Sequence, residues 1–455
     1  MSLRLASAPA ISLALLLTAC PLTDHYYLLH EAAGVDNGGA SGSFGAGESG
    51  GADAGESSRG GAVNTTSGGG GRPETAGSPG CANGCNAARA CLSNGCESGW
   101  VAMSPPPESL VARSKSASVA MGKAVFIWGG LDNNGAALGN GAIYEPANDT
   151  WTPLPMEPGS PTPRIMATAV WTGNSSNKVI VYGGTDASGT TVYRDGAVFD
   201  IAGNSWSALP SSASTSKRSA PFGYWDGTHA VFFGGLNATP AVVIGADRFD
   251  LEKWSVSTVT GDPGLLGFSA IGFDGTVMYL QGGVIGSTRQ DKVYAYTSST
   301  DKWATLSQSL SARTGAFGAW DGTRFVVWGG QDDLGLRDDG KMMSGTSWSD
   351  MSSSGAPSAR RIGFRRSGWA FQVSSGVIAV LGGQTSISGT STTSGTLASN
   401  GATYAAESGA WSAIPNWPSG EPHEYGIGVW TGEEFVIWGG RSQNVSTLTG
   451  ERWAP

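Results

Sequence analysis

The sequence predicts an all-β protein that folds as one seven-bladed β-propeller with four-stranded antiparallel blades. The first observation is a pair of glycines at the end of a short hydrophobic run, which recurs seven times at intervals of 47 to 57 residues. A period of about 50 residues with this signature is typical of propellers, in which each repeat forms one blade. The seven pairs are Gly129-Gly130, Gly183-Gly184, Gly234-Gly235, Gly282-Gly283, Gly329-Gly330, Gly382-Gly383 and Gly439-Gly440.

Aromatic residues downstream of the glycines are the second observation. In five repeats an aromatic residue follows the second glycine by 13 to 15 residues, and Met343 or Tyr404 takes its place in the other two. In six repeats a tryptophan follows five or seven residues later, after turn-forming residues that indicate a hairpin. The aromatic residues are Tyr144, Phe199, Phe249, Tyr296 and Trp453, and the tryptophans are Trp151, Trp206, Trp254, Trp303, Trp348 and Trp411.

A turn signal upstream of the glycines is the third observation. Asp226-Gly227, Asp274-Gly275 and Asp321-Gly322 each precede a hydrophobic run, and Asp-Gly favours the positive φ angles of tight hairpin turns. Each repeat therefore predicts four strands. The first precedes the turn, the second ends in the glycines, the third carries the aromatic residue and the fourth begins at the tryptophan.

The two ends of the repeat region predict how the ring closes. The chain ends two residues after Trp453, in the place of a third strand, so the last blade lacks a fourth strand. The segment at Trp100 resembles the fourth strand at Trp151, and each tryptophan precedes an arginine, Arg113 or Arg164, by 13 residues. We expect the N-terminal strand to complete the last blade, which leaves no unpaired seam.

The combined pattern of arginine, hydrophobic strand, Gly-Gly, aromatic residue and tryptophan resembles the kelch repeat. The resemblance covers about residues 98–455, and its landmarks recur in register seven times. It implies a propeller whose function depends on its loops, because one fold serves many functions. The family includes copper-radical oxidases, which need a tyrosine cross-linked to cysteine together with histidine ligands. Here no cysteine follows Cys96, and only His229 and His423 lie in the repeats, so this activity is rejected.

The N-terminus predicts export and a lipid anchor. Residues 1–19 have the short apolar core of a signal peptide, and they end in Leu17-Thr18-Ala19-Cys20, which resembles a bacterial lipobox. This implies cleavage before Cys20 and acylation of its thiol and amino group. An ordinary signal peptide or a buried thiol are the alternatives. Pro21 is not the aspartate that retains lipoproteins at the inner membrane, so we expect the outer membrane or cell surface, with the periplasmic face left open.

Residues 20–80 predict a tether, because the glycine, serine, alanine and threonine of residues 34–80 offer too little apolar surface to fold. The following segment, residues 81–97, contains four cysteines in an exported chain, which favours two disulfides. Three connectivities are open. Zinc is the alternative, although the spacings lack paired Cys-x2-Cys knuckles. The four residues are Cys81, Cys85, Cys91 and Cys96.

Composition limits the partners of the chain. The net charge is −9 and 14% of residues are charged, which disfavours nucleic acid. We expect a monomer that needs no cofactor and no metal and contacts the membrane only through its anchor. Asp132, Asp186 and Asp332 follow the glycines but lack the spacing of a calcium loop. Local turn chemistry accounts for them.

One set of basic residues is a candidate ligand site. It occupies equivalent positions at the entry to the first strand of several blades, and its members are Arg113, Arg164, Arg218, Arg313 and His423. Because first strands surround the axis, these side chains could face one mouth of the channel and bind carboxylates. The alternative is a structural role in bonding neighbouring loops. The fourth blade has Leu266 at this position, and the sixth is ambiguous among several arginines.

These observations favour a non-enzymatic binding platform for a protein or glycan whose identity the sequence does not reveal. The alternative is a sugar-processing isomerase or lyase of the kelch type, for which no acid or base can be placed. The polar insertion at residues 385–400 follows a Gly-Gly pair. It should therefore lie on the same face as the loops that enter the first strands.

Overall fold

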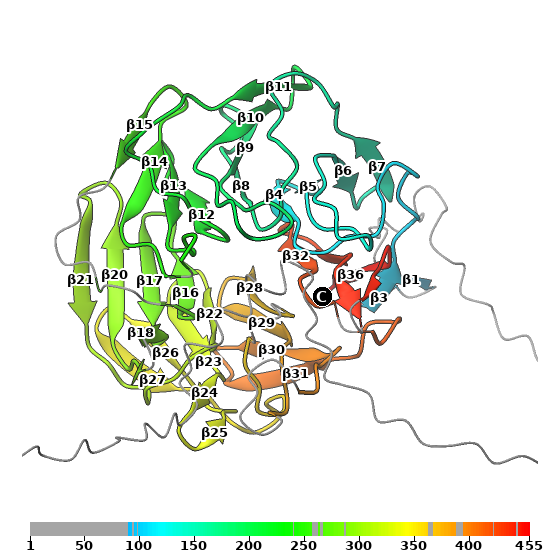
Figure 1. Ribbon diagram of the computed structural model, residues 1–455. Helices are drawn as coiled ribbons and strands as arrows, with labels where there is room; N and C mark the ends of the chain where they lie inside the picture. The colour runs from blue at the N-terminus through cyan, green and yellow to red at the C-terminus, as the bar shows by residue number, and fades with distance from the viewer. Residues whose placement is uncertain are drawn as a thin grey trace, which may run out of the picture.

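The computed structural model describes residues 90–92, 95–97, 99–239, 241–256, 263, 267–285, 288–362, 367–387, 395–421, 423–442 and 445–455. Seven four-stranded antiparallel sheets stand around a central axis, so the predicted seven-bladed β-propeller is confirmed (Figure 1). Among the described residues there is no helix, and hence none long and apolar enough to cross a membrane.

The strands of each blade are named below from the innermost to the outermost. The first three blades follow chain order, and their register matches the predicted four strands. Blade one contains β4 (Ala117–Met121), β5 (Ala124–Trp128), β6 (Gly141–Glu145) and β7 (Thr150–Pro153). Blade two contains β8 (Thr168–Trp171), β9 (Lys178–Tyr182), β10 (Gly196–Asp200) and β11 (Ser205–Ala208). Blade three contains β12 (Phe222–Trp225), β13 (Ala230–Phe233), β14 (Ala246–Phe249) and β15 (Trp254–Val256).

Blades four to six repeat this order, and small hairpins extend the loops of blades four and five. Blade four contains β16 (Ala270–Phe273), β17 (Val277–Gln281), β20 (Val293–Thr297) and β21 (Lys302–Leu306), with the hairpin β18 (Val284–Ile285) and β19 (Thr288–Arg289). Blade five contains β22 (Phe317–Trp320), β23 (Phe325–Trp328), β26 (Gly340–Ser344) and β27 (Ser347–Asp350), with the hairpin β24 (Gln331–Asp332) and β25 (Gly335–Leu336). Blade six contains β28 (Gly368–Ser374), β29 (Val377–Gly382), β30 (Gly401–Ala405) and β31 (Ala410–Ile414).

The seventh blade confirms the predicted ring closure. It contains β32 (Ile427–Trp430), β33 (Phe435–Trp438), β36 (Gly450–Ala454) and the N-terminal β3 (Gly99–Ala102), with the hairpin β34 (Arg441–Ser442) and β35 (Val445–Ser446). In the β3–β36 register, Trp100 lies opposite Trp453. The Trp100 indole also donates to the carbonyl of Pro415 in blade six, at 3.0 Å. The N-terminal strand therefore joins the last blade to its neighbour.

The core lies between the blades. The second strand of each blade is covered on both faces, which explains why it appears as a continuous apolar run in the sequence. Phe126, Ile127 and Trp128 on β5 are at most 1% exposed, for example. Fourth-strand tryptophans extend across to the preceding blade, where Trp206 donates to the carbonyl of Pro155 at 3.2 Å.

The paired glycines answer a steric need where neighbouring blades meet. Gly129 and Gly130 have φ angles of 72° and 109°, which other residues rarely adopt. A Cβ on Gly129 would lie 2.9 Å from the carbonyl oxygen of Arg164 in the next blade. That same oxygen accepts a bond from the Gly130 amide at 3.0 Å. The same bond to the following blade recurs at four other second glycines, which are Gly184, Gly283, Gly330 and Gly440.

Candidate functional site

The structure buries the candidate arginines instead of turning them toward the channel mouth. Arg113, Arg164, Arg218 and Arg313 are 0–1% exposed, and so is His423 at 1%. The arginines donate from Nη1 to the carbonyl of the first glycine in their own blade. The bonds are Arg113–Gly129 (3.2 Å), Arg164–Gly183 (3.1 Å), Arg218–Gly234 (2.8 Å) and Arg313–Gly329 (3.1 Å). Of the two roles considered for these residues, this geometry corresponds to the structural one.

The same hydrogen bond identifies which arginine of the sixth blade occupies the equivalent position. Arg360 is 2% exposed, and its Nη1 donates to the carbonyl of Gly382 at 3.0 Å. It also donates to the carbonyl of Asn400 at 3.1 Å, as Arg113 does to that of Asn140. Of the other arginines in this stretch, residues 365 and 366 lie outside the described residues, as does Leu266 of blade four.

In blade seven, His423 replaces the arginine. Its Nδ1 lies 2.6 Å from the carbonyl oxygen of Gly439, and its Nε2 lies 3.1 Å from Glu451 Oε2. Burial raises the pKa of Glu451, but the hydrogen bond from His423, its charge and the bonds from Ser419 outweigh burial, so the net pKa lies below the ordinary value. An imidazole and a carboxylate are thus engaged with each other inside the blade.

Three of the arginines also face carboxylates of their own blade. Arg218 and Asp247 form a pair at 2.6 Å with side chains 1% and 0% exposed. Arg164–Asp195 (2.8 Å) and Arg313–Asp339 (3.1 Å) are the two others, with more exposed carboxylates. Burial lowers the pKa of Arg113 to about 10, and Asp132 partly offsets this effect. The guanidinium groups of Arg164, Arg218 and Arg313 are therefore paired within the fold, whereas Arg113 Nη2 is buried without a hydrogen-bond partner among the described residues.

The aspartates after the glycines fold their own loops. Asp132 Oδ1 accepts from the amides of Asn134 and Ala136 at 2.9 and 2.8 Å. Asp186 Oδ1 accepts from the amide of Thr190 at 3.0 Å. These are Asx-type turns, as the local chemistry predicts. No group of three metal-ligating side chains occurs within the part of the chain that the structure describes.

The cysteine predictions lie largely outside the described residues. Cys20, Cys81 and Cys85 belong to the part of the chain before residue 90. Cys91 and Cys96 lie on β1 (Ala90–Leu92) and β2 (Gly95–Glu97), and the antiparallel register places them opposite each other. The two-disulfide arrangement stays a prediction.

A cavity of about 640 Å³ on the propeller axis is the site that the sequence reasoning missed. It is lined by the innermost strands and by the chain segments that enter them. Between blades three and four it extends outward to Phe233 and Leu280. Its volume falls within the range of about 300–1,000 Å³ that is usual for small-ligand pockets.

A ring of residues in the left-handed conformation surrounds one end of the cavity. Each lies two positions after the arginine position, and adjacent members are joined by backbone hydrogen bonds, such as Met166 amide to Lys115 carbonyl at 2.9 Å. The members with positive φ are Lys115 (60°), Met166 (55°), Ala220 (52°), Phe268 (58°), Gly315 (64°) and Tyr425 (53°). All except Gly315 line the cavity. The sequence could have revealed this ring, because its members all lie two residues after the arginine position of their repeat.

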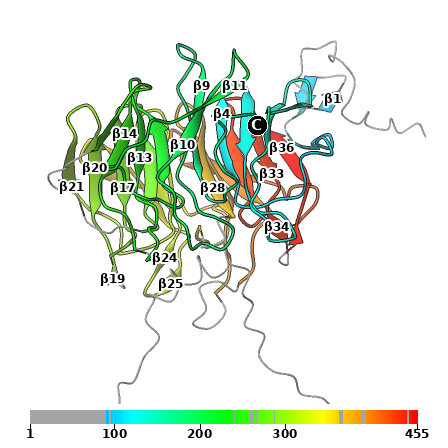
Figure 2. The same ribbon diagram turned by 45° about the horizontal axis from the view of Figure 1, so that its top comes forward.

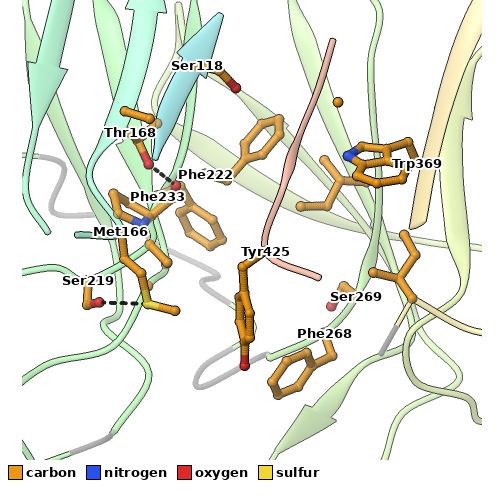
Figure 3. Close-up of a pocket in the computed structure, with 18 of the residues that line it drawn as sticks. Ser118, Met166, Thr168, Ser219, Phe222, Phe233, Phe268, Ser269, Trp369 and Tyr425 are labelled. Carbon is orange, nitrogen blue, oxygen red and sulfur yellow. Dashed lines mark hydrogen bonds between the residues drawn. The ribbon is translucent and has the colours of Figure 1, made fainter. Parts of the chain in front are cut away.

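The lining combines aromatic rings with hydroxyl groups (Figure 3). Phe222, Phe268, Trp369 and Tyr425 come from four different blades. Lys115 is the only charged lining residue among those described, and its Nζ lies 5.1 Å from the centre of the Tyr425 ring. The described lining is therefore uncharged apart from one ammonium group.

The hydroxyl groups differ in what they already bond. Thr168 donates to the carbonyl of Pro221 at 2.6 Å, and Ser269 donates to that of Gly282 at 3.0 Å, so both keep only acceptor capacity. Within the described residues, neither the Ser118 hydroxyl nor the indole N–H of Trp369 has a hydrogen-bond partner. These two groups can donate to a ligand.

No protein-family model matches this chain, and no curated protein matches it either. The functional conclusion must therefore come from the site.

Proposed function

We propose that this chain is an exported, lipid-anchored propeller of the kelch type that acts as a binding platform for a protein or glycan of the cell envelope. The repeat landmarks and the lipobox-like segment ending at Cys20 support this proposal. The propeller supplies a rigid ring, and the loops at one end supply the contacts.

The distribution of exposed apolar side chains is the observation that indicates the working surface. The loop face is formed by the connections from second to third strand and from each blade to the next. Among the described residues, seven large apolar side chains are exposed, and six lie in these loops. They are Val111, Met156, Ile244, Leu334, Val445 and Leu448. Figure 2 shows the hairpins containing β24, β25 and β34 on this same side of the ring.

The cavity lining supports binding over catalysis. General acid–base chemistry needs a positioned carboxylic acid, imidazole or similar group within reach of the substrate. The described lining contains no carboxylate and no imidazole, and its Lys115 ammonium lies over the Tyr425 ring. His423 and Glu451 are bonded to each other inside blade seven. We therefore propose the platform in preference to a sugar-processing isomerase or lyase.

A matched pair of substitutions tests the working surface. Leu334 is 87% exposed on the loop face, whereas Val256 is 37% exposed on an outer strand. The immobilised mature protein would be challenged with solubilised envelope glycans and proteins. Leu334→Asp should reduce retention at least tenfold, and Val256→Asp should leave it unchanged. Equal retention by both variants, with both folded by circular dichroism, would contradict the proposal.

A further inference from the structure

We infer that the axial cavity is a binding site for a neutral sugar unit, such as the end of an oligosaccharide. This inference rests on the proposed binding function and names the ligand class of its central site. The cavity lies at the loop-face end of the inner strands, because its lining includes Gly234, Gly235 and the entry residues Lys115 and Ser116. A ligand held there would be contacted by several blades at once.

The residues of the left-handed ring carry side chains at positions where glycine would be less strained, which indicates that these side chains contribute to binding. Residues other than glycine are disfavoured at positive φ, and such strain concentrates where ligands are held. Blade five shows that glycine fits this position, because Gly315 occupies it with a φ of 64°. Met166 and Phe268 nevertheless retain large side chains that line the cavity. These two side chains add conformational strain to the folded chain, and they enlarge the apolar surface that is open to a ligand.

The polar groups of the cavity suit a ligand with many hydroxyl groups. The Ser118 hydroxyl and the Trp369 indole N–H are donors without a partner in the described structure. Thr168 and Ser269 can still accept, since each already donates to a backbone carbonyl. The innermost strand of every blade is also an edge strand, so one row of its backbone amides and carbonyls faces the axis. Sugar hydroxyls donate and accept together, which matches this mixture.

The apolar groups suit the faces of a pyranose ring. Phe222 and Trp369 occupy the register position where β4 and β16 carry the alanines Ala117 and Ala270. Their ring faces offer flat surfaces for the C–H groups of a sugar. Figure 3 shows Phe222 and Trp369 on opposite sides of the cavity. A sugar can stack on one ring while its hydroxyls reach the strand edges.

The described lining has little charge with which to bind an acidic ligand. Lys115, the only charged residue of the described lining, already lies against the Tyr425 ring, and Arg441 lies 5.0 Å from the same ring. The arginines that could bind a carboxylate are buried in the blades. An anion entering the cavity would lose its hydration and would meet a single ammonium group, Lys115, which already lies against an aromatic ring.

Calorimetric titration of the mature full-length protein tests the inference, with cellobiose, maltose and N,N′-diacetylchitobiose as neutral probes and digalacturonate as the anionic control. At least one neutral disaccharide should bind, and digalacturonate should bind at least tenfold more weakly. Phe268→Gly should weaken binding at least tenfold while leaving the melting temperature unchanged or higher, because glycine relieves the positive φ. Ser118→Ala and Trp369→Leu should also weaken binding.

Asn204→Gly is the matched control, because Asn204 is exposed, has a φ of 45° and lies in a turn away from the cavity. It should bind sugar like the wild type. The inference is overturned if no neutral probe binds, if digalacturonate binds best, or if Phe268→Gly binds as tightly as Asn204→Gly. If these titrations fail while Leu334→Asp still reduces retention, the platform stands and only its ligand class is wrong. If neither effect is seen, the proposed function fails as well.

Discussion

At the scale of single residues, the arginine positions show how one side chain stabilises a blade. Each guanidinium joins the loop that enters the first strand to the carbonyl of a glycine at the end of the second strand. That carbonyl lies where the chain turns through two positive φ angles, so no strand partner is available to it. The arginine supplies the missing donor, which accounts for its recurrence at this spacing.

Arg218→Ala should strongly destabilise the fold. Asp247, whose side chain is 0% exposed, would lose its closest partner. Breaking such a buried pair costs about 3–5 kcal/mol. Chemical denaturation would measure the free energy of unfolding. Replacing both partners by leucine should cost much less, and a loss below about 1 kcal/mol for Arg218→Ala would contradict the structural role.

Asp149 should make the stability of the ring sensitive to acid. Burial raises its pKa, but bonds from Ser104 and Tyr144 and the charge of Arg452 outweigh this effect, so the net pKa is lowered. A lowered folded-state pKa stabilises the protein fully above the unfolded value of about 3.9, and this stability is lost as pH falls below it.

Asp149→Asn keeps the shape of the side chain and tolerates the φ of 53° at this position. Its free energy of unfolding should therefore fall less steeply than that of the wild type as pH decreases below about 4. Denaturant titrations at a series of pH values would measure both curves. Parallel curves would show that Asp149 does not contribute.

At the scale of secondary-structure elements, β3 decides whether the ring is closed. Its Trp100 contacts the rings of Trp417, Phe435 and Trp453 at centroid distances of 5.9, 6.4 and 6.5 Å. Without β3, the whole edge of β36 would lose its partner, because β3 is its neighbour on that side. An exposed edge strand is a template for aggregation.

Deleting residues 98–103 should therefore abolish cooperative melting and cause aggregation. Differential scanning calorimetry and light scattering would detect these two effects. Deleting six residues from the insertion at 385–400 is a control that removes no inner or outer strand of a blade. A β3-deleted protein that melts like the full ring would show that closure does not depend on this strand.

At the scale of the whole molecule, the proposed lipid anchor would determine where the loop face meets its proposed partner. Several acyl chains give stable membrane attachment, whereas one chain gives only marginal binding. Cys20→Ser should abolish acylation and leave an unprocessed or soluble protein. Mass spectrometry of the mature N-terminus and membrane fractionation would detect the change. An unmodified Cys20 in the native protein would contradict the anchor.

The fold could be predicted closely from the sequence because its landmarks act locally. Gly129 and Gly130 must be glycines for reasons of φ and close contact, and Trp100 could be paired with Trp453 by counting along the repeat. The arginine positions were also found correctly. Their orientation stayed open between two alternatives, because a count along the chain does not tell whether a side chain at a strand entry turns inward to a carbonyl or outward to solvent.

The sequence by itself thus determined the number of blades, their four-stranded order and the closure of the ring, since these follow from a repeated local pattern. Only the tertiary structure decided which surface is free to bind. The axial cavity exists because seven inner strands meet at one axis, and its lining combines residues from different repeats, such as Ser118, Phe268 and Trp369. No single repeat contains that site, so no repeat pattern could reveal it.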